Sequence, residues 1–178
     1  MSRTVCNAWI PLALTAMLGG CGLVQSVKDT TTSTTEAIFY KQVKTLHLDL
    51  SARTAMNTEA TDMSALSVPT LVRIYQLRDS QLAQNATYDD VVGEGHHVLG
   101  ADLLDEHAVV VKPGEGGQLD VPLSKDARFV AVVALFRDPD LSSQSWRLML
   151  TRDELDPDRP RVIELGDNRL TLRLLAKD

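Results

Sequence analysis

Hydrophobic and polar residues alternate along most of the chain from residue 45 onward. Leu46, Leu48 and Leu50 are separated by polar residues, and this two-residue period is typical of a strand with one buried face. The run 129–136 is apolar at every position, which predicts a central strand covered on both faces. The other strand-like segments are residues 70–77, 108–111, 119–123, 146–151, 161–165 and 170–175.

Turn-forming residues separate these segments. Pro-Gly-Glu-Gly-Gly at 113–117 ends the third segment, and such glycine and proline runs mark turns. Gly166, Asp167 and Asn168 stand between the last two segments, which predicts a tight hairpin. About eight short strands separated by turns predict an antiparallel β-sandwich, forming a mainly β domain over residues 43–178.

One segment, 79–104, lacks the strand alternation and lies between the second and third predicted strands. Thr87 is followed three residues later by Asp90, an arrangement typical of a helix N-terminus. An apolar stripe for two short helices could come from Leu82, Ala86, Val91 and Val92. We therefore expect a small helical insertion lying across the sandwich.

The N-terminus carries a different pattern, an apolar stretch over residues 8–18 preceded by Arg3. It is shorter than the ~20 residues that a membrane-spanning helix needs, and its composition is typical of a secretory signal. Leu18-Gly19-Gly20-Cys21 resembles a bacterial lipobox, in which the cysteine is acylated and becomes the first residue of the mature protein. An ordinary signal peptide that happens to end near a cysteine is the alternative.

This interpretation divides the chain into three parts. Residues 1–20 are expected to be a lipoprotein signal peptide. Residues 21–42 are expected to be an acylated N-terminus and tether, because the Thr/Ser run 30–35 has nothing to bury. Residues 43–178 form the folded domain.

Charge and cysteine content narrow the function. The chain has 18 basic and 24 acidic residues, a net charge of −6, and no cluster of Lys and Arg along the sequence. This balance argues against nucleic acid and against electrostatic attraction to anionic membranes. Membrane attachment would then depend on acyl chains at Cys21. With Cys6 removed in the signal and Cys21 acylated, the mature domain has no thiol for a disulfide or for catalysis.

Candidate catalytic or metal-binding residues are few. His96 and His97 are adjacent, so on a strand they would point to opposite faces, and no third ligand with suitable spacing is evident. We expect them in a solvated loop, and His47 and His107 at the surface. No nucleophile elbow, zinc-protease motif or phosphate-binding glycine loop occurs. The sequence therefore predicts no enzyme activity, no metal and no cofactor.

The connection between the first two strands, residues 52–69, is unusually long. A hairpin needs only 2–5 linking residues. Long loops on rigid scaffolds are often functional, but lengthening a surface loop also costs little free energy. The pattern alone leaves both interpretations open.

Several short motifs together resemble the TssJ family, the outer-membrane lipoproteins of type VI secretion systems. They follow the lipobox in the order found in that family and cover residues 43–175. The motifs are Val72-Arg73-Ile74-Tyr75-Gln76-Leu77, Ala101-Asp102-Leu103-Leu104, Lys112-Pro113-Gly114-Glu115, Ala134-Leu135-Phe136-Arg137-Asp138 and Trp146-Arg147.

The resemblance implies a transthyretin-like sandwich, anchored by Cys21 at the periplasmic face of the outer membrane. It further implies binding to the periplasmic C-terminal domain of the inner-membrane protein TssM and, through TssM, association with other subunits such as TssL. The loop between the first two strands takes part in that contact in the family. The candidate contact residues are Arg53, Met56, Asn57, Thr58, Glu59, Asp62, Met63 and Leu66.

Two other classes stay open at this stage. One is a different periplasmic lipoprotein that binds a ligand or assists envelope assembly. The other is an enzyme, because transthyretin-like sandwiches include hydroxyisourate hydrolases. Those enzymes end in Tyr-Arg-Gly-Ser, whereas this chain ends in Leu174-Leu175-Ala176-Lys177-Asp178.

Overall fold

The computed structural model describes residues 42–59 and 66–175. The expected signal peptide, Cys21 and the tether lie outside the described residues, as do Asp62 and Met63 of the long loop. Within the part that is described, no helix is long and apolar enough to cross a membrane.

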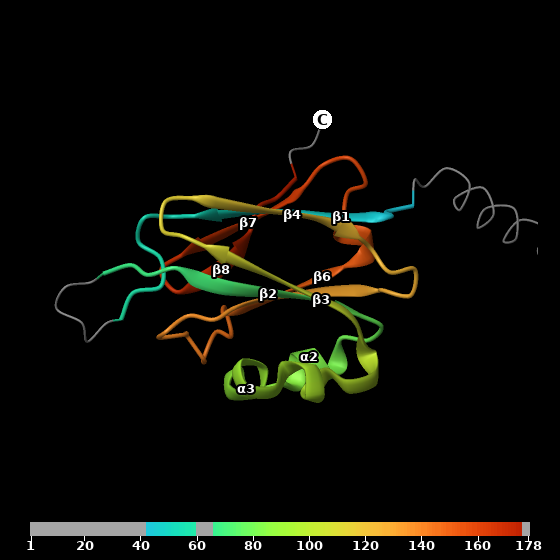
Figure 1. Ribbon diagram of the computed structural model, residues 1–178, viewed down its shortest axis with the longest axis horizontal. Coiled ribbons are helices and arrows are strands. Elements are labelled where there is room, and N and C mark those ends of the chain that lie inside the picture. Colours follow the sequence, from blue (N-terminus) through green and yellow to red (C-terminus); the bar gives the residue numbers. More distant parts are fainter. Residues whose placement is uncertain (1–41, 60–65, 176–178) are drawn as a thin grey trace, which may run out of the picture. The chain divides into compact units, whose positions relative to one another are not determined.

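The described residues form two four-stranded sheets that pack face to face (Figure 1). The first sheet has the order β4-β1-β7-β8 and the second the order β3-β2-β5-β6, which confirms a mainly β sandwich. The first sheet comprises β1 (Thr45–Ala52), β4 (Gly116–Pro122), β7 (Arg161–Gly166) and β8 (Arg169–Leu172). The second comprises β2 (Thr70–Leu77), β3 (Leu103–Val111), β5 (Phe129–Ala134) and β6 (Arg147–Thr151).

One strand pair departs from the antiparallel prediction. β1 and β7 run parallel, with Leu50 opposite Ile163, so the first sheet is mixed. Alternation of apolar residues reports which face of a strand is buried but not the direction of its neighbour. Since β1 and β7 are far apart in the sequence, the chain has room for the crossover that parallel strands need.

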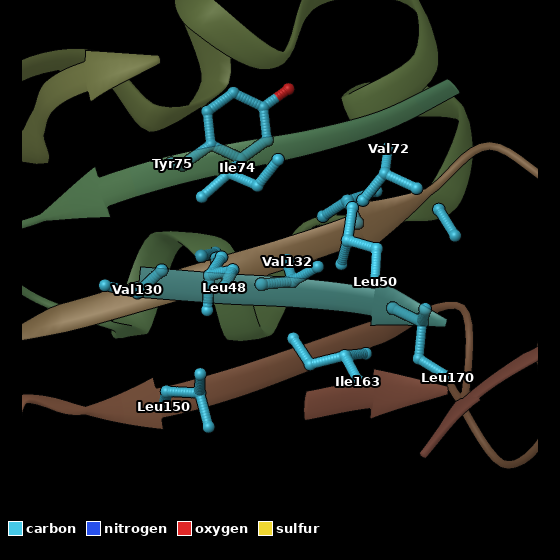
Figure 2. Close-up of a cluster of buried hydrophobic side chains, with 14 of the residues drawn as sticks. Leu48, Leu50, Val72, Ile74, Tyr75, Val130, Val132, Leu150, Ile163 and Leu170 are labelled. Carbon is cyan, nitrogen blue, oxygen red and sulfur yellow. The ribbon is translucent and has the colours of Figure 1, made fainter. Parts of the chain in front are cut away.

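The core lies between the two sheets. Leu46, Leu48 and Leu50 of β1 are fully buried, as their alternation predicts. Figure 2 shows Leu48 and Leu50 among Ile74 and Val132 of the facing sheet. Burial of apolar surface of this kind supplies most of the stabilisation of a small domain without disulfides.

β5 is covered on both faces, as its continuous apolar run predicts, and all of its residues from Val130 to Ala134 are buried. Val132 pairs with Ile74 on the face toward the other sheet. On the opposite face Ala131 pairs with Tyr75, whose hydroxyl lies against Gly95 of the helical layer. A Cβ at Gly95 would come within 2.7 Å of that hydroxyl, so glycine permits this close approach.

The helical layer covers the second sheet and lies between β2 and β3, as predicted (Figure 1). It comprises α2 (Gln81–Asn85), α3 (Tyr88–Leu99) and the 3₁₀ turn η1 (Gly100–Asp102). Thr87 begins α3 with a capping box: its hydroxyl accepts a hydrogen bond from the Asp90 amide at 3.2 Å, and the Asp90 carboxylate accepts one from the Thr87 amide at 2.9 Å. The hydrogen bonds that the Asp90 carboxylate makes with the Thr87 hydroxyl and backbone amide hold the pKa of Asp90 below its ordinary value.

Two expectations for this layer were wrong in detail. His96 and His97 are exposed, but they lie within α3 rather than in a loop; the helix continues past a kink at Glu94, where φ is −135°. Of the predicted apolar stripe, Ala86 and Val91 are buried whereas Leu82 and Val92 are exposed. The short helix and the kink change which residues face the sheet.

Arg147 of β6 fastens α2 to the sheet. Its guanidinium donates hydrogen bonds to the carbonyls of Ala83 at 2.7 Å and Ala86 at 2.9 Å, and also to the carbonyl of Gln84. Carbonyls at a helix C-terminus have no partner within the helix, and that end attracts cations. Arg147 therefore satisfies the end of α2 and fixes the helix on the outer face of the second sheet.

Candidate partner-binding end of the sandwich

Four connections meet at one end of the sandwich, which we call the loop end. They are the β1–β2 loop, the β3–β4 turn, the β5–β6 connection and the β7–β8 hairpin. Backbone hydrogen bonds join them: the Arg53 amide donates to the Leu165 carbonyl at 2.8 Å, and the Gly114 amide donates to the Arg53 carbonyl at 3.2 Å. The long loop is therefore attached to its neighbours where it leaves β1.

Asn57 is the centre of this attachment. It is only 2% exposed and has a φ of 51°, a left-handed conformation that asparagine tolerates better than most residues. Its side-chain oxygen accepts a hydrogen bond from the Arg137 amide at 2.7 Å, and its side-chain nitrogen donates to the Pro69 carbonyl at 3.3 Å. Asn57 thus joins the start of the β1–β2 loop to its end and to the β5–β6 connection.

Asn168 makes a second attachment from the β7–β8 hairpin. Asp167 and Asn168 have φ of 51° and 59°, as a two-residue type I′ turn requires, so the predicted hairpin is confirmed. The Asn168 side chain accepts a hydrogen bond from the Thr58 amide at 2.8 Å and donates to the Thr58 carbonyl at 2.7 Å. It also donates to the Asp138 carbonyl at 2.9 Å. Both backbone polar groups of Thr58 are therefore satisfied by a residue far away in the sequence.

The predicted contact residues fall into two groups. The side chains of Met56 and Asn57 are buried, so they hold the loop from within and do not form its surface. Arg53 is exposed, and Leu66 is 63% exposed. Glu59 is partly exposed and makes an ion pair with Arg137.

A further exposed residue at this end was missed by sequence reasoning. Leu141 in the β5–β6 connection is 60% exposed. The Asp140 carboxylate beside it accepts hydrogen bonds from the amides and hydroxyls of both Ser142 and Ser143, which holds its pKa well below its usual range. An Asp followed by Ser residues is a sequence signal for such a turn. Only the fold shows that the β5–β6 connection meets the β1–β2 loop, through Arg137.

Replacing Asn57 with alanine is expected to lower the free energy of unfolding by about 1–3 kcal/mol, because it leaves the Arg137 amide and the Pro69 carbonyl without their buried partner. Urea denaturation followed by circular dichroism measures the loss. Asn85→Ala, at an exposed position of α2, is the matched control and should change stability by no more than about 0.5 kcal/mol. Equal effects of the two substitutions would contradict the role given to Asn57.

The described residues contain no group of three or more His, Cys, Asp or Glu side chains that could hold a metal ion. The histidines in strands, His47 and His107, pair with the exposed carboxylates Asp120 and Asp105. Binding residues are often carried by loops that a sandwich or similar scaffold positions, and the loop end has this arrangement.

The family follows from the sequence match. The model of the family described as "Type VI secretion lipoprotein, VasD, EvfM, TssJ, VC_A0113" matches residues 44–175, and the chain belongs to this family. Its members are membrane-associated structural lipoproteins of type VI secretion systems, not enzymes. No curated protein matches the chain.

Solved structures have the same fold. A chain in the structure described as "T6SS protein TssM C-terminal domain (869-1107) from EAEC" is 39% identical, has a TM-score of 0.68, and covers 75% of this chain and 100% of that chain. A chain in the structure described as "Type VI membrane complex" is 41% identical, with a TM-score of 0.70 and the same coverage. The lipoprotein TssJ1 from Pseudomonas aeruginosa is 23% identical, has a TM-score of 0.60, and covers 75% of this chain and 98% of that chain.

Proposed function

We propose that acyl chains on Cys21 anchor this protein to the periplasmic face of the outer membrane, and that its loop end binds the periplasmic C-terminal domain of TssM. The protein would then link the type VI secretion machine, including TssL through TssM, to the outer membrane. Family membership supports a structural role in the secretion complex. The descriptions of the structures that contain the 39% and 41% identical chains support a partnership with TssM in the membrane complex.

The observation that carries this proposal is the direction of β1. The chain enters the domain at Val43 and Lys44, and β1 then runs for 8 residues to Ala52 at the loop end (Figure 1). A strand of that length spans about 26 Å. The chain that precedes residue 43 thus joins the domain at one end, and the loop end, where we propose that TssM binds, is the other end of the domain, as linking two structures requires.

The exposed side chains of the loop end suit a protein partner. Leu66 and Leu141 offer apolar surface, and the ion pair between Glu59 and Arg137 lies on the same loops. Apolar anchors surrounded by polar groups are typical of protein interfaces. We propose that Arg53, Thr58, Glu59, Asp62, Met63, Leu66 and Leu141 contact TssM, and that Met56 and Asn57 support them from beneath.

Replacing Leu66 with aspartate is expected to weaken binding to the purified TssM C-terminal domain at least about tenfold, because burying a leucine contributes ~1.5–3 kcal/mol. The melting temperature should stay nearly unchanged, since the side chain is exposed in the unbound protein. Calorimetry or surface plasmon resonance measures the affinity.

The matched control is Leu82→Asp, which places the same charge at an exposed leucine of α2, in the helical layer. It should leave the affinity unchanged. Unaltered binding by Leu66→Asp together with weaker binding by Leu82→Asp would assign the TssM contact to the helical layer instead.

A further inference from the structure

The end of the sandwich opposite the loop end, which we call the tether end, contains an open hollow of about 560 Å³. Arg78, Lys125, Arg128 and Arg152 line it, together with the carboxylates of Asp79 and Asp126. These residues come from the end of β2, the β4–β5 turn and η2 (Arg152–Glu154), which follows β6. The basic residues are dispersed in the sequence, and only the fold brings them together.

Arg152 forms a rigid wall of this hollow. Its guanidinium donates hydrogen bonds to the carbonyls of Ser124 at 3.0 Å, Ala127 at 2.7 Å and Val43 at 2.7 Å. It therefore fixes the β4–β5 turn beside the point where the chain enters the domain. The hollow therefore lies next to Val43, near the start of the folded domain.

The cations of the β4–β5 turn are available to a ligand. The side chains of Lys125 and Arg128 are exposed and have no hydrogen bond or ion pair among the described residues. Four cations face two carboxylates in the hollow, and one of the two, Asp79, accepts a hydrogen bond from the Gln81 amide at 2.8 Å. The hollow thus has an excess of positive charge on a chain whose net charge is −6.

We propose that this hollow binds the phosphate groups of anionic phospholipid headgroups. Guanidinium groups match the geometry of phosphate oxygens, and basic residues near an anionic membrane surface are attracted to it. With the proposed anchor at Cys21, on which this lipid source rests, only twenty residues separate the membrane attachment from Gln42. Headgroup binding at the tether end would orient the loop end away from the membrane.

The test uses residues 42–178, which form one compact unit with its own core, so that no acyl chain contributes to binding. The unit is sedimented with vesicles of phosphatidylcholine, with and without phosphatidylglycerol. We expect association only with the phosphatidylglycerol vesicles, and its loss at high salt, where charges are screened within a few ångströms. The double variant Lys125→Gln/Arg128→Gln should weaken the association about tenfold or more, at roughly fivefold for each cation.

The matched control, Lys112→Gln/Arg169→Gln, removes two exposed cations elsewhere on the domain and should keep the association within about twofold. If both double variants lost vesicle association equally, the association would depend on the net charge of the domain and not on the hollow, and the proposal would be overturned. Equal binding to both vesicle types would also overturn it. So would saturation of the hollow by inorganic phosphate, observed by NMR, without any vesicle binding, since the ligand would then be a free anion. None of these outcomes depends on TssM, so failure here is distinct from failure of the proposed function.

Discussion

Replacing Cys21 with serine is expected to abolish acylation and to remove the protein from the outer-membrane fraction, while the domain stays folded. A serine hydroxyl cannot form the thioether that carries the diacylglycerol. Each buried methylene of an acyl chain contributes about 0.8 kcal/mol, and stable anchoring takes two hydrophobic signals. The measurement is the intact mass of the native protein together with its distribution between membrane fractions.

Cys6→Ser is the matched control, because Cys6 is the other cysteine of the chain and precedes the proposed cleavage site. This variant should mature with the same acylated mass as the parent protein. An acyl mass that persists in Cys21→Ser, or a native N-terminus that begins elsewhere than Cys21, would contradict the anchor. The folded domain itself is monitored by circular dichroism, which should be the same in both variants.

Replacing Trp146 with alanine is expected to lower the free energy of unfolding by about 3–5 kcal/mol. Trp146 is 2% exposed and packs edge-to-face on Tyr88, with ring centroids 5.2 Å apart. The guanidinium carbon of Arg147 lies 5.0 Å from the centroid of the Trp146 ring. It therefore supports both the core and the helical layer, and its loss leaves a cavity where both meet. For a domain of this size the melting temperature should fall by roughly 10 °C.

Urea denaturation followed by circular dichroism measures this loss, because the substitution removes the tryptophan of the folded domain, which fluorescence would report. Trp146→Phe keeps an aromatic ring against Tyr88 and should lose clearly less stability than the alanine variant. If Trp146→Ala lowered the free energy of unfolding by less than about 1 kcal/mol, Trp146 would not have the proposed role of packing the helical layer against the core. Leu174→Ala, at an exposed position, should be nearly neutral.

Much of the fold could be predicted because the hydrophobic period is a local property. The alternation of Leu46, Leu48 and Leu50 identified β1, and the apolar run from Phe129 identified a strand covered on both faces. Asp167 and Asn168 identified the hairpin, because few residue pairs adopt positive φ at two successive positions. Strand direction could not be predicted in this way, so the parallel pairing of β1 with β7 was missed.

The candidate site was predictable only in outline. The length of the β1–β2 connection singled out this loop as a candidate, but an irregular segment has no period from which inside and outside can be told apart. The sequence therefore could not show that Met56 and Asn57 are buried while Leu66 is exposed. Leu141 was missed for a related reason, since it lies on a different connection that only the fold brings to the same end.

By itself the sequence determined the strands and the helical insertion with its capping residue Thr87, because each depends on neighbouring residues alone. The lipobox around Cys21 is likewise a local pattern, and it stays a prediction. Only the tertiary structure decided which distant residues meet. Asn168 satisfies the backbone of Thr58, and Arg78 joins Arg128 in a basic hollow, although neither pair is close in sequence. Such contacts arise when the packing of apolar faces brings separate connections together at the two ends of the sandwich. The alternation of apolar and polar residues within one segment does not show how the segments pack.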